Sequence, residues 1–130
     1  MKYLLAIYFD ETSADDVTPE QAQARTAAYF AVGQQMTESG AYLAGEGLQS
    51  TATATTVRVR DGERVVSDGP FAETKEQLGG FYMIDVANLD DALGWAEKIP
   101  SARTGSIEVR PVMDYEARQE QRDAAAAQRA

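Results

Sequence analysis

The chain has 130 residues, of which 44 % are hydrophobic and 25 % are charged, as in an ordinary globular protein. This length predicts one domain with one hydrophobic core. With 12 Lys and Arg against 21 Asp and Glu, the net charge is −9, which disfavours nucleic acid as a direct partner because its phosphates would be repelled. No apolar run approaches the roughly 20 residues that cross a bilayer, so we expect no membrane association and a cytoplasmic location.

Neither cysteine nor histidine occurs in the sequence. Their absence excludes disulfides, thiolate nucleophiles, Ser-His-Asp catalysis and metal sites that use histidine. Any acid–base chemistry must therefore use Asp, Glu, Lys or Tyr with a shifted pKa. We expect neither a cofactor nor a metal.

Residues 2–9 predict a first strand, because the positions after Lys2 are all apolar. Apolar side chains on both faces indicate a central strand that is covered on each side. The run is short and is followed by an acidic loop at 10–16 rather than by a small-residue cleavage site. We therefore predict a strand and not a signal peptide.

A helix begins after this loop. Thr18 is an N-cap residue, Pro19 suits the first helical position, and Gln21 completes a capping box. The pair Ser39-Gly40 indicates the C-terminal end. The residues that are expected to face the sheet recur at helical spacing: Ala22, Thr26, Tyr29, Phe30, Gly33 and Met36.

Two glycines interrupt the next predicted strand, at residues 41–48. Glycine weakens a strand, so Gly45 and Gly47 indicate a bulge or the close approach of another part of the chain. A polar link at 49–56 follows.

A β-hairpin is predicted next, with strands at 56–60 and 63–67. The Asp61-Gly62 pair between them is typical of a type I′ turn, in which both central residues need positive φ. Valine and arginine alternate along the first of these strands, so one face of the hairpin should be exposed to water.

The second half of the domain repeats the pattern of strand, helix and strand. A strand is predicted at 81–86, a helix between its cap at Asn88 and Pro100, and a last strand at 106–113. The buried stripe of this helix should be Leu89, Ala92, Leu93, Ala96 and Ile99. We predict a domain at residues 1–114 and a polar tail, helical or disordered, at 115–130.

The predicted order of elements is βαββαβ with an inserted β-hairpin, which is the α+β ferredoxin-like arrangement. A four-stranded sheet with helices on one face leaves its other face uncovered. Uncovered apolar faces tend to pair, so we expect a homodimer whose two sheets enclose a shared core or cleft, a dimeric α/β barrel.

The segment 68–82 is the densest in turn formers and ionisable groups. Its sequence Asp68-Gly69-Pro70-Phe71, followed by Glu73, Lys75, Glu76, Gly79 and Gly80, resembles the DGPF signature of the YCII-related (DGPF-domain) family. Residues 44–48, 56–58 and 108–111 also resemble the pattern of this family, in the same order. The resemblance covers about residues 1–114.

This resemblance implies a dimeric α+β barrel, similar in fold to muconolactone isomerases. It also implies a link of this branch to extracytoplasmic-function sigma factors. Some relatives are thought to use a His-Asp pair in a cleft, and this chain, which lacks histidine, departs from them there.

Four ionisable residues of the segment are candidates for a site: Asp68, Glu73, Lys75 and Glu76. Lys75 would bind an anionic or carbonyl oxygen and a carboxylate would act as the base, so the catalytic candidates are Lys75, Glu76 and Asp68. The alternative is a structural turn with an ion pair at Lys75, which would contribute little to stability. The glycines Gly79 and Gly80 fit a ligand that approaches the backbone, or a β-bulge.

Other candidates lie on the predicted strands. A charged residue on a covered strand must be paired, and Glu46 with Arg110 is a suitable pair that would fix a dimer or bind a polar ligand. The predicted ligand-binding set is Glu46, Asp68, Glu73, Lys75, Tyr82 and Arg110.

Three functional interpretations follow. The first is a homodimeric small-molecule-binding protein, which includes an isomerase- or lyase-like enzyme, with its cleft near residues 68–82. The second is a non-enzymatic regulatory or protein-interaction module linked to a sigma-factor system. The third is a stable dimer with vestigial activity. The sequence names no reaction.

Overall fold

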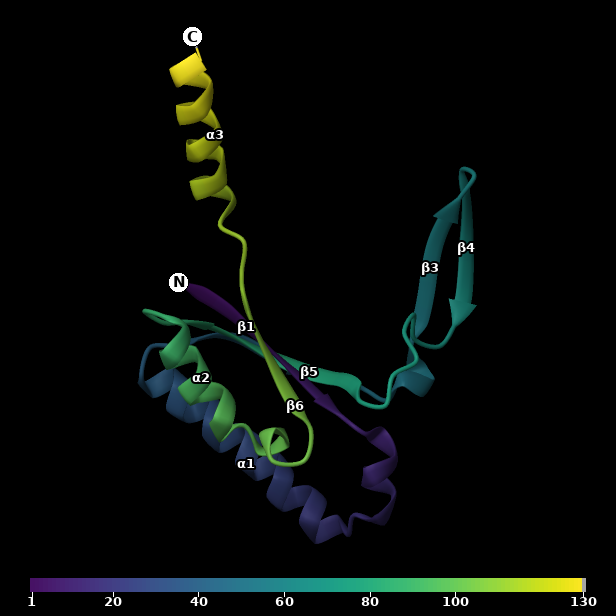
Figure 1. Ribbon diagram of the computed structural model, residues 1–130. Coiled ribbons are helices and arrows are strands. Elements are labelled where there is room, and N and C mark those ends of the chain that lie inside the picture. The colour runs from purple at the N-terminus through teal and green to yellow at the C-terminus, as the bar shows by residue number, and fades with distance from the viewer. Residues whose placement is uncertain (130) are drawn as a thin grey trace.

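The computed structural model describes residues 1–129, apart from the side chains of residues 14 and 15. The helices and strands are β1 Lys2–Phe9, α1 Pro19–Glu38, β2 Tyr42–Gly47, β3 Thr55–Arg60, β4 Glu63–Asp68, β5 Gln77–Asp85, α2 Leu89–Lys98, β6 Ser106–Pro111 and α3 Tyr115–Arg129. Four strands form an antiparallel sheet in the order β2-β5-β1-β6. Helices α1 and α2 lie on one side of this sheet (Figure 1). This α+β arrangement is compatible with the predicted ferredoxin-like fold.

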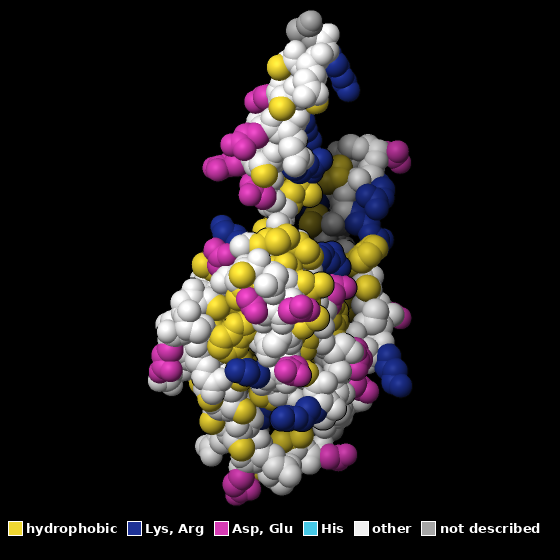
Figure 2. All heavy atoms as spheres, turned by 60° about the vertical axis from the view of Figure 1, so that its left-hand side comes forward, with side chains coloured by type: hydrophobic (Ala, Val, Ile, Leu, Met, Phe, Trp, Pro, Cys, Tyr) yellow, Lys and Arg dark blue, Asp and Glu magenta, His cyan; other side chains and the backbone are white. Residues whose placement is uncertain are grey.

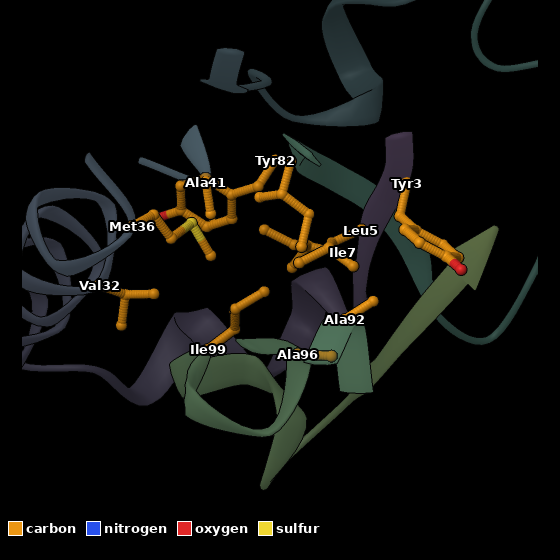
Figure 3. Close-up of a cluster of buried hydrophobic side chains, with 11 residues drawn as sticks. Tyr3, Leu5, Ile7, Val32, Met36, Ala41, Tyr82, Ala92, Ala96 and Ile99 are labelled. Atoms are coloured by element: carbon orange, nitrogen blue, oxygen red, sulfur yellow. The ribbon is translucent and has the colours of Figure 1, made fainter. Parts of the chain in front are cut away.

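The core lies between the sheet and these two helices (Figure 3). Leu5 from β1, Met36 from α1 and Ile84 from β5 meet there and have no exposed surface. Burial of each such side chain contributes about 1.5 to 3 kcal/mol. The remaining buried members of this cluster are Tyr3, Ile7, Val32, Ala41, Tyr82, Ala92, Ala96 and Ile99.

The N-terminus of α1 has the predicted capping box. The Gln21 backbone N–H donates to the Thr18 hydroxyl over 3.2 Å, and the Thr18 backbone N–H donates to the Gln21 side-chain oxygen over 3.0 Å. A 3₁₀ helix at Glu11–Asp16 occupies most of the predicted acidic loop.

The prediction that one stripe of α1 packs on the sheet is correct only near the C-terminal end of the helix. Val32 and Met36 are the buried residues of this helix. Phe30, in contrast, is 75 % exposed. The reason is that the N-terminal part of α1 faces the sheet across a groove instead of packing against it. In α2, likewise, Leu89 and Leu93 are exposed rather than buried.

Strand β5 begins at Gln77, four residues before the predicted strand at 81–86. Gly79 is the extra residue of a bulge in its pairing with β1, so the bulge predicted at Gly79-Gly80 is confirmed. A Cβ atom at Gly79 would lie 2.0 Å from Cε1 of Phe9. The glycine therefore makes room for the Phe9 ring, and this close approach explains how glycines occur inside a strand.

Strands β3 and β4 form a separate two-stranded sheet that extends away from the body (Figure 1). The turn residues Asp61 and Gly62 have φ values of 53° and 76°, the signs that a type I′ turn requires. The side chains of Val57 and Val59 are 61 % and 64 % exposed. A two-stranded hairpin is marginally stable on its own in water, so these valines are candidates for contact with another surface.

Helix α3 has no buried residue. Figure 2 shows it projecting from the body as a separate column, with acidic and basic side chains along its length. The backbone N–H of Ala117 donates to the Asp114 carboxylate over 3.0 Å, which caps the start of the helix. None of the helices in the described part of the chain is both long and apolar enough to cross a membrane.

Because α3 buries nothing against the body, its removal should leave the domain intact. We expect a chain that ends at Asp114 to differ from the full chain by less than about 0.5 kcal/mol in free energy of unfolding, as measured by urea denaturation. A chain that ends at residue 105 is the control, since it also lacks β6 and should not fold. A loss of several kcal/mol on removal of α3 alone would contradict this prediction.

Candidate functional site

A groove of about 950 Å³ lies between α1 and the sheet. Helix α1 forms one wall, and residues of β1, β2 and β5 form the other. The predicted helical stripe therefore faces this groove. Six aromatic residues line it: Phe9, Tyr29, Phe30, Tyr42, Phe81 and Tyr82.

The sheet side of the groove carries glycines. In the strand pairing, Gly45 lies beside Tyr82 and Gly47 lies beside Gly80. A Cβ atom at Gly45 would lie 2.8 Å from Cδ1 of Tyr82, whereas no atom lies within 4 Å of a Cβ atom placed at Gly47. The close approach that the sequence indicated therefore occurs at Gly45, and the space above Gly47 is open.

Tyr82 connects the two walls. Its hydroxyl donates to the Tyr29 carbonyl oxygen of α1 over 2.9 Å, and its ring meets that of Tyr42 edge to face with 6.4 Å between centroids. Burial raises the pKa of Tyr82 to about 12, with smaller contributions from Tyr29 and Tyr42. Tyr82 is thus a neutral phenol at physiological pH.

Arg25 is the one positively charged residue in the described lining of the groove. Its guanidinium lies 5.1 Å from the centroid of the Phe9 ring, and Nη2 donates to Oγ of Ser101 over 3.0 Å. Ser101 is fully buried and also shares a hydrogen bond with the Tyr29 hydroxyl. Sequence reasoning missed Arg25, although its spacing from Ala22 and Tyr29 places it on the predicted stripe.

The segment 68–82 enters the groove only at its C-terminal end, at residues 79–82. Asp68, Glu73 and Lys75 are exposed and are not among the residues that line the groove. Glu76 is half-buried and accepts a hydrogen bond from the Ser106 hydroxyl over 2.8 Å. The polar half of the segment therefore does not meet the groove within one chain.

Lys75 lies close enough to Asp10 to affect it. Hydrogen bonds from Thr12 hold the pKa of Asp10 below its usual value, and the charge of Lys75 adds a smaller effect in the same direction. Among the described residues no carboxylate lies within 4.0 Å of the Lys75 ammonium, so the ion pair of the structural alternative stays a prediction. A role of Lys75 in binding stays a prediction.

Glu46 and Arg110 lie far apart within the chain. Glu46 is on β2 and lines the groove, whereas Arg110 is on β6. Because β5 and β1 separate these edge strands, the strands that carry the two residues are about 14 Å apart across the sheet. Arg110 instead forms a 2.6 Å ion pair with Glu108, two residues earlier on the same strand, so the expected pairing with Glu46 is wrong within one chain.

The predicted ligand-binding residues are thus divided. The structure brings Glu46 and Tyr82 to one groove and places the other four members of the set elsewhere. Among the side chains that the structure describes, no three Asp or Glu residues are grouped so as to hold a metal ion. A groove lined by six aromatic residues, with one cation and one acidic residue, is chemically suited to binding a largely apolar ligand.

Comparison with known proteins places this chain in a family. The family model described as YCII-related domain matches residues 1–116. The chain is also 42 % identical over 117 residues to a protein of Rhizobium meliloti (strain 1021) named Uncharacterized protein R00369, an alignment that covers 88 % of this chain and 94 % of that protein. Both matches span most of the chain, and the chain belongs to the YCII-related domain family.

Proposed function

We propose that the protein is a homodimeric small-molecule-binding protein whose ligand occupies the groove between α1 and the sheet. The observation that carries this proposal is the groove itself, which has the volume of a ligand site and a mainly apolar lining with six aromatic residues. Its position replaces the cleft that was expected around Lys75, and it uses only the end of the segment 68–82.

The binding proposal is tested by filling the groove. Gly47 lines the groove, its φ is not in the left-handed region, and a Cβ atom there meets no other atom within 4 Å. A larger side chain at this position should therefore enter the open space without disturbing the fold. We expect compounds that raise the melting temperature of the wild type in a metabolite thermal-shift screen to have no effect on Gly47→Leu.

Gly94→Leu is the matched control, since Gly94 lies in α2 outside the groove and also has open space around it. It should keep the response of the wild type. Compounds that stabilise Gly47→Leu as strongly as the wild type would show that the ligand binds elsewhere.

The dimeric part of the proposal is supported by the uncovered face of the sheet. Leu4, Tyr8 and Met83 are half-buried on this face, and Leu78 is 42 % exposed. The residues pair across β1 and β5 and form a continuous apolar surface opposite the helices. An apolar sheet face of this kind in a small domain is normally covered by a partner, and a second copy of the chain can pair with it symmetrically.

Static light scattering at micromolar concentration tests the dimer. We expect the mass of two chains for the wild type and of one chain for Leu78→Glu, because a buried carboxylate without a partner opposes association. Leu93→Glu is the control, since Leu93 is exposed to a similar extent, 47 %, but lies on α2. A monomeric wild type would refute the dimer.

A second candidate function, protein interaction, rests on the exposed valines of the β3–β4 hairpin. If the hairpin packs on the second copy, Val59→Asp should weaken the dimer in the same light-scattering experiment. An unchanged dimer would show that Val59 does not support the dimer, and would leave the hairpin free to contact another protein, as the regulatory interpretation linked to sigma factors requires.

A further inference from the structure

We propose that the ligand of the groove is an apolar monocarboxylic acid, with its carboxylate on Arg25 and its apolar part between α1 and the glycines of β2. This inference rests on the proposed function, since it names the class of ligand for the same groove. It goes beyond that function because it assigns a charge, a polarity and an orientation to the ligand.

The position of Arg25 determines where the charged end of the ligand binds. Its guanidinium is held by the Phe9 ring beneath it and by the hydrogen bond to buried Ser101. That hydrogen bond uses one of the five N–H donors of a guanidinium. Among the described side chains, no carboxylate lies within 4.0 Å of Arg25, so the remaining donors are available to a ligand.

The geometry of the guanidinium favours a carboxylate. Its planar fork matches the two oxygens of a carboxylate or the oxygens of a phosphate, with two parallel hydrogen bonds. Arg25 is the one cation of the described groove lining, Glu46 is its one acidic residue, and the chain itself has a net charge of −9. Ligands with several negative charges, such as nucleotides, would therefore be repelled on average, and a monoanion is preferred.

The remaining lining of the groove determines which kind of apolar group the ligand carries. From Ala22 to Thr37 the lining follows α1 for about 22 Å, at 1.5 Å per residue. Along this length the opposite wall offers the Tyr82 ring and the open backbone of Gly47. The Tyr82 hydroxyl is already bonded to α1, so its ring rather than its hydroxyl is offered to the ligand. A flat ring or an alkyl chain fits such a surface.

Two pairs of ligands, each an acid and its neutral amide, test the effect of ligand charge separately from that of ligand shape. 4-Phenylbutyrate and decanoate carry the two kinds of apolar part, and 4-phenylbutyramide and decanamide are their neutral counterparts. With isothermal titration calorimetry at pH 7.5, we expect the wild type to bind at least one acid about tenfold or more tightly than its amide, as one charge-assisted hydrogen-bonded pair allows. The preferred pair identifies whether the groove takes rings or chains.

The variants then assign this preference to Arg25. In Arg25→Gln the acid and its amide should bind equally, and Arg25→Lys should keep part of the preference, since it keeps the charge but not the fork. Equal binding of acid and amide by the wild type, or a loss of both probes together in Arg25→Gln, would overturn the assignment of an acid. Gly47→Leu should lose both probes. If it binds them as the wild type does, the groove is not the site and the proposed function itself fails.

Discussion

Gly105→Ala is expected to lower the free energy of unfolding by about 3 kcal/mol, the upper part of the usual range for overpacking. A Cβ atom at Gly105 would lie 2.1 Å from the carbonyl oxygen of Tyr8 and 3.1 Å from Cα of Phe9. Both are backbone atoms of β1, so the clash cannot be relieved by the rotation of a side chain. Such a loss is a large share of the roughly 5 to 15 kcal/mol that stabilise a typical domain.

The control for this substitution is Gly94→Ala. Gly94 lies inside α2, and a Cβ atom there meets nothing within 4 Å. Because alanine is the better helix former, this variant should gain about 0.5 to 1 kcal/mol. Urea denaturation followed by circular dichroism measures both. If Gly105→Ala proved as stable as the wild type, the close contact between β1 and the turn before β6 would be disproved.

The turn that contains Gly105 also supports the groove. The Gly105 backbone N–H donates to the Ser101 carbonyl oxygen over 2.7 Å, and the Ser101 hydroxyl accepts the hydrogen bond from Arg25. Gly105 thus helps to hold the turn that holds the proposed anion-binding residue. A variant that moves this turn should weaken the binding of acids more than that of amides.

Local features of the fold were predictable from the sequence because they depend on a few neighbouring residues. The capping box at Thr18, the positive φ values at Asp61 and Gly62 and the cap at Asn88 were all predicted correctly for this reason. The bulge at Gly79 was also predicted, since glycine weakens a strand and usually occurs inside one where a bulge or a close approach requires it.

The groove could not be predicted in the same way. A helical stripe that packs on a sheet and one that faces it across a gap have the same spacing in the sequence. Whether the helix packs on the sheet or faces a gap depends on the size of the residues opposite it, here the glycines of β2. Which residues lie opposite the helix is decided by tertiary structure and not by the spacing within the helix. For the same reason the stripe was predicted to be buried, although Phe30 is mostly exposed.

Arg25, one of the two charged residues of the groove, was missed for a related reason. The prediction followed the density of ionisable groups in residues 68–76, whereas the groove has a single cation on a helix. Glu46 and Arg110 were paired on the basis of charge alone, and the strand order separates them. Arg25 gave a weak signal, because one arginine on an apolar stripe commonly extends to water with its stem packed.

Met36→Ala is expected to cost about 2 to 5 kcal/mol, the range for removing a fully buried large aliphatic side chain. Met36 has no exposed surface and, with Val32, supplies the buried contacts of α1. Met36→Leu conserves the volume and should cost less than about 1.5 kcal/mol. Met113→Ala is the matched control, because Met113 is 49 % exposed and surface substitutions change stability by about 0.5 kcal/mol or less.

The expected loss has a consequence for binding, since α1 is one wall of the groove. If Met36 holds that wall, Met36→Leu should keep both its stability and its affinity for the probes, whereas Met36→Ala should lose affinity for acids and amides alike. This pattern differs from that of Arg25→Gln, in which only the preference for the acid disappears. A Met36→Ala variant as stable as Met113→Ala would mean that other contacts, such as the hydrogen bond from Tyr82 to Tyr29, fix α1 against the sheet.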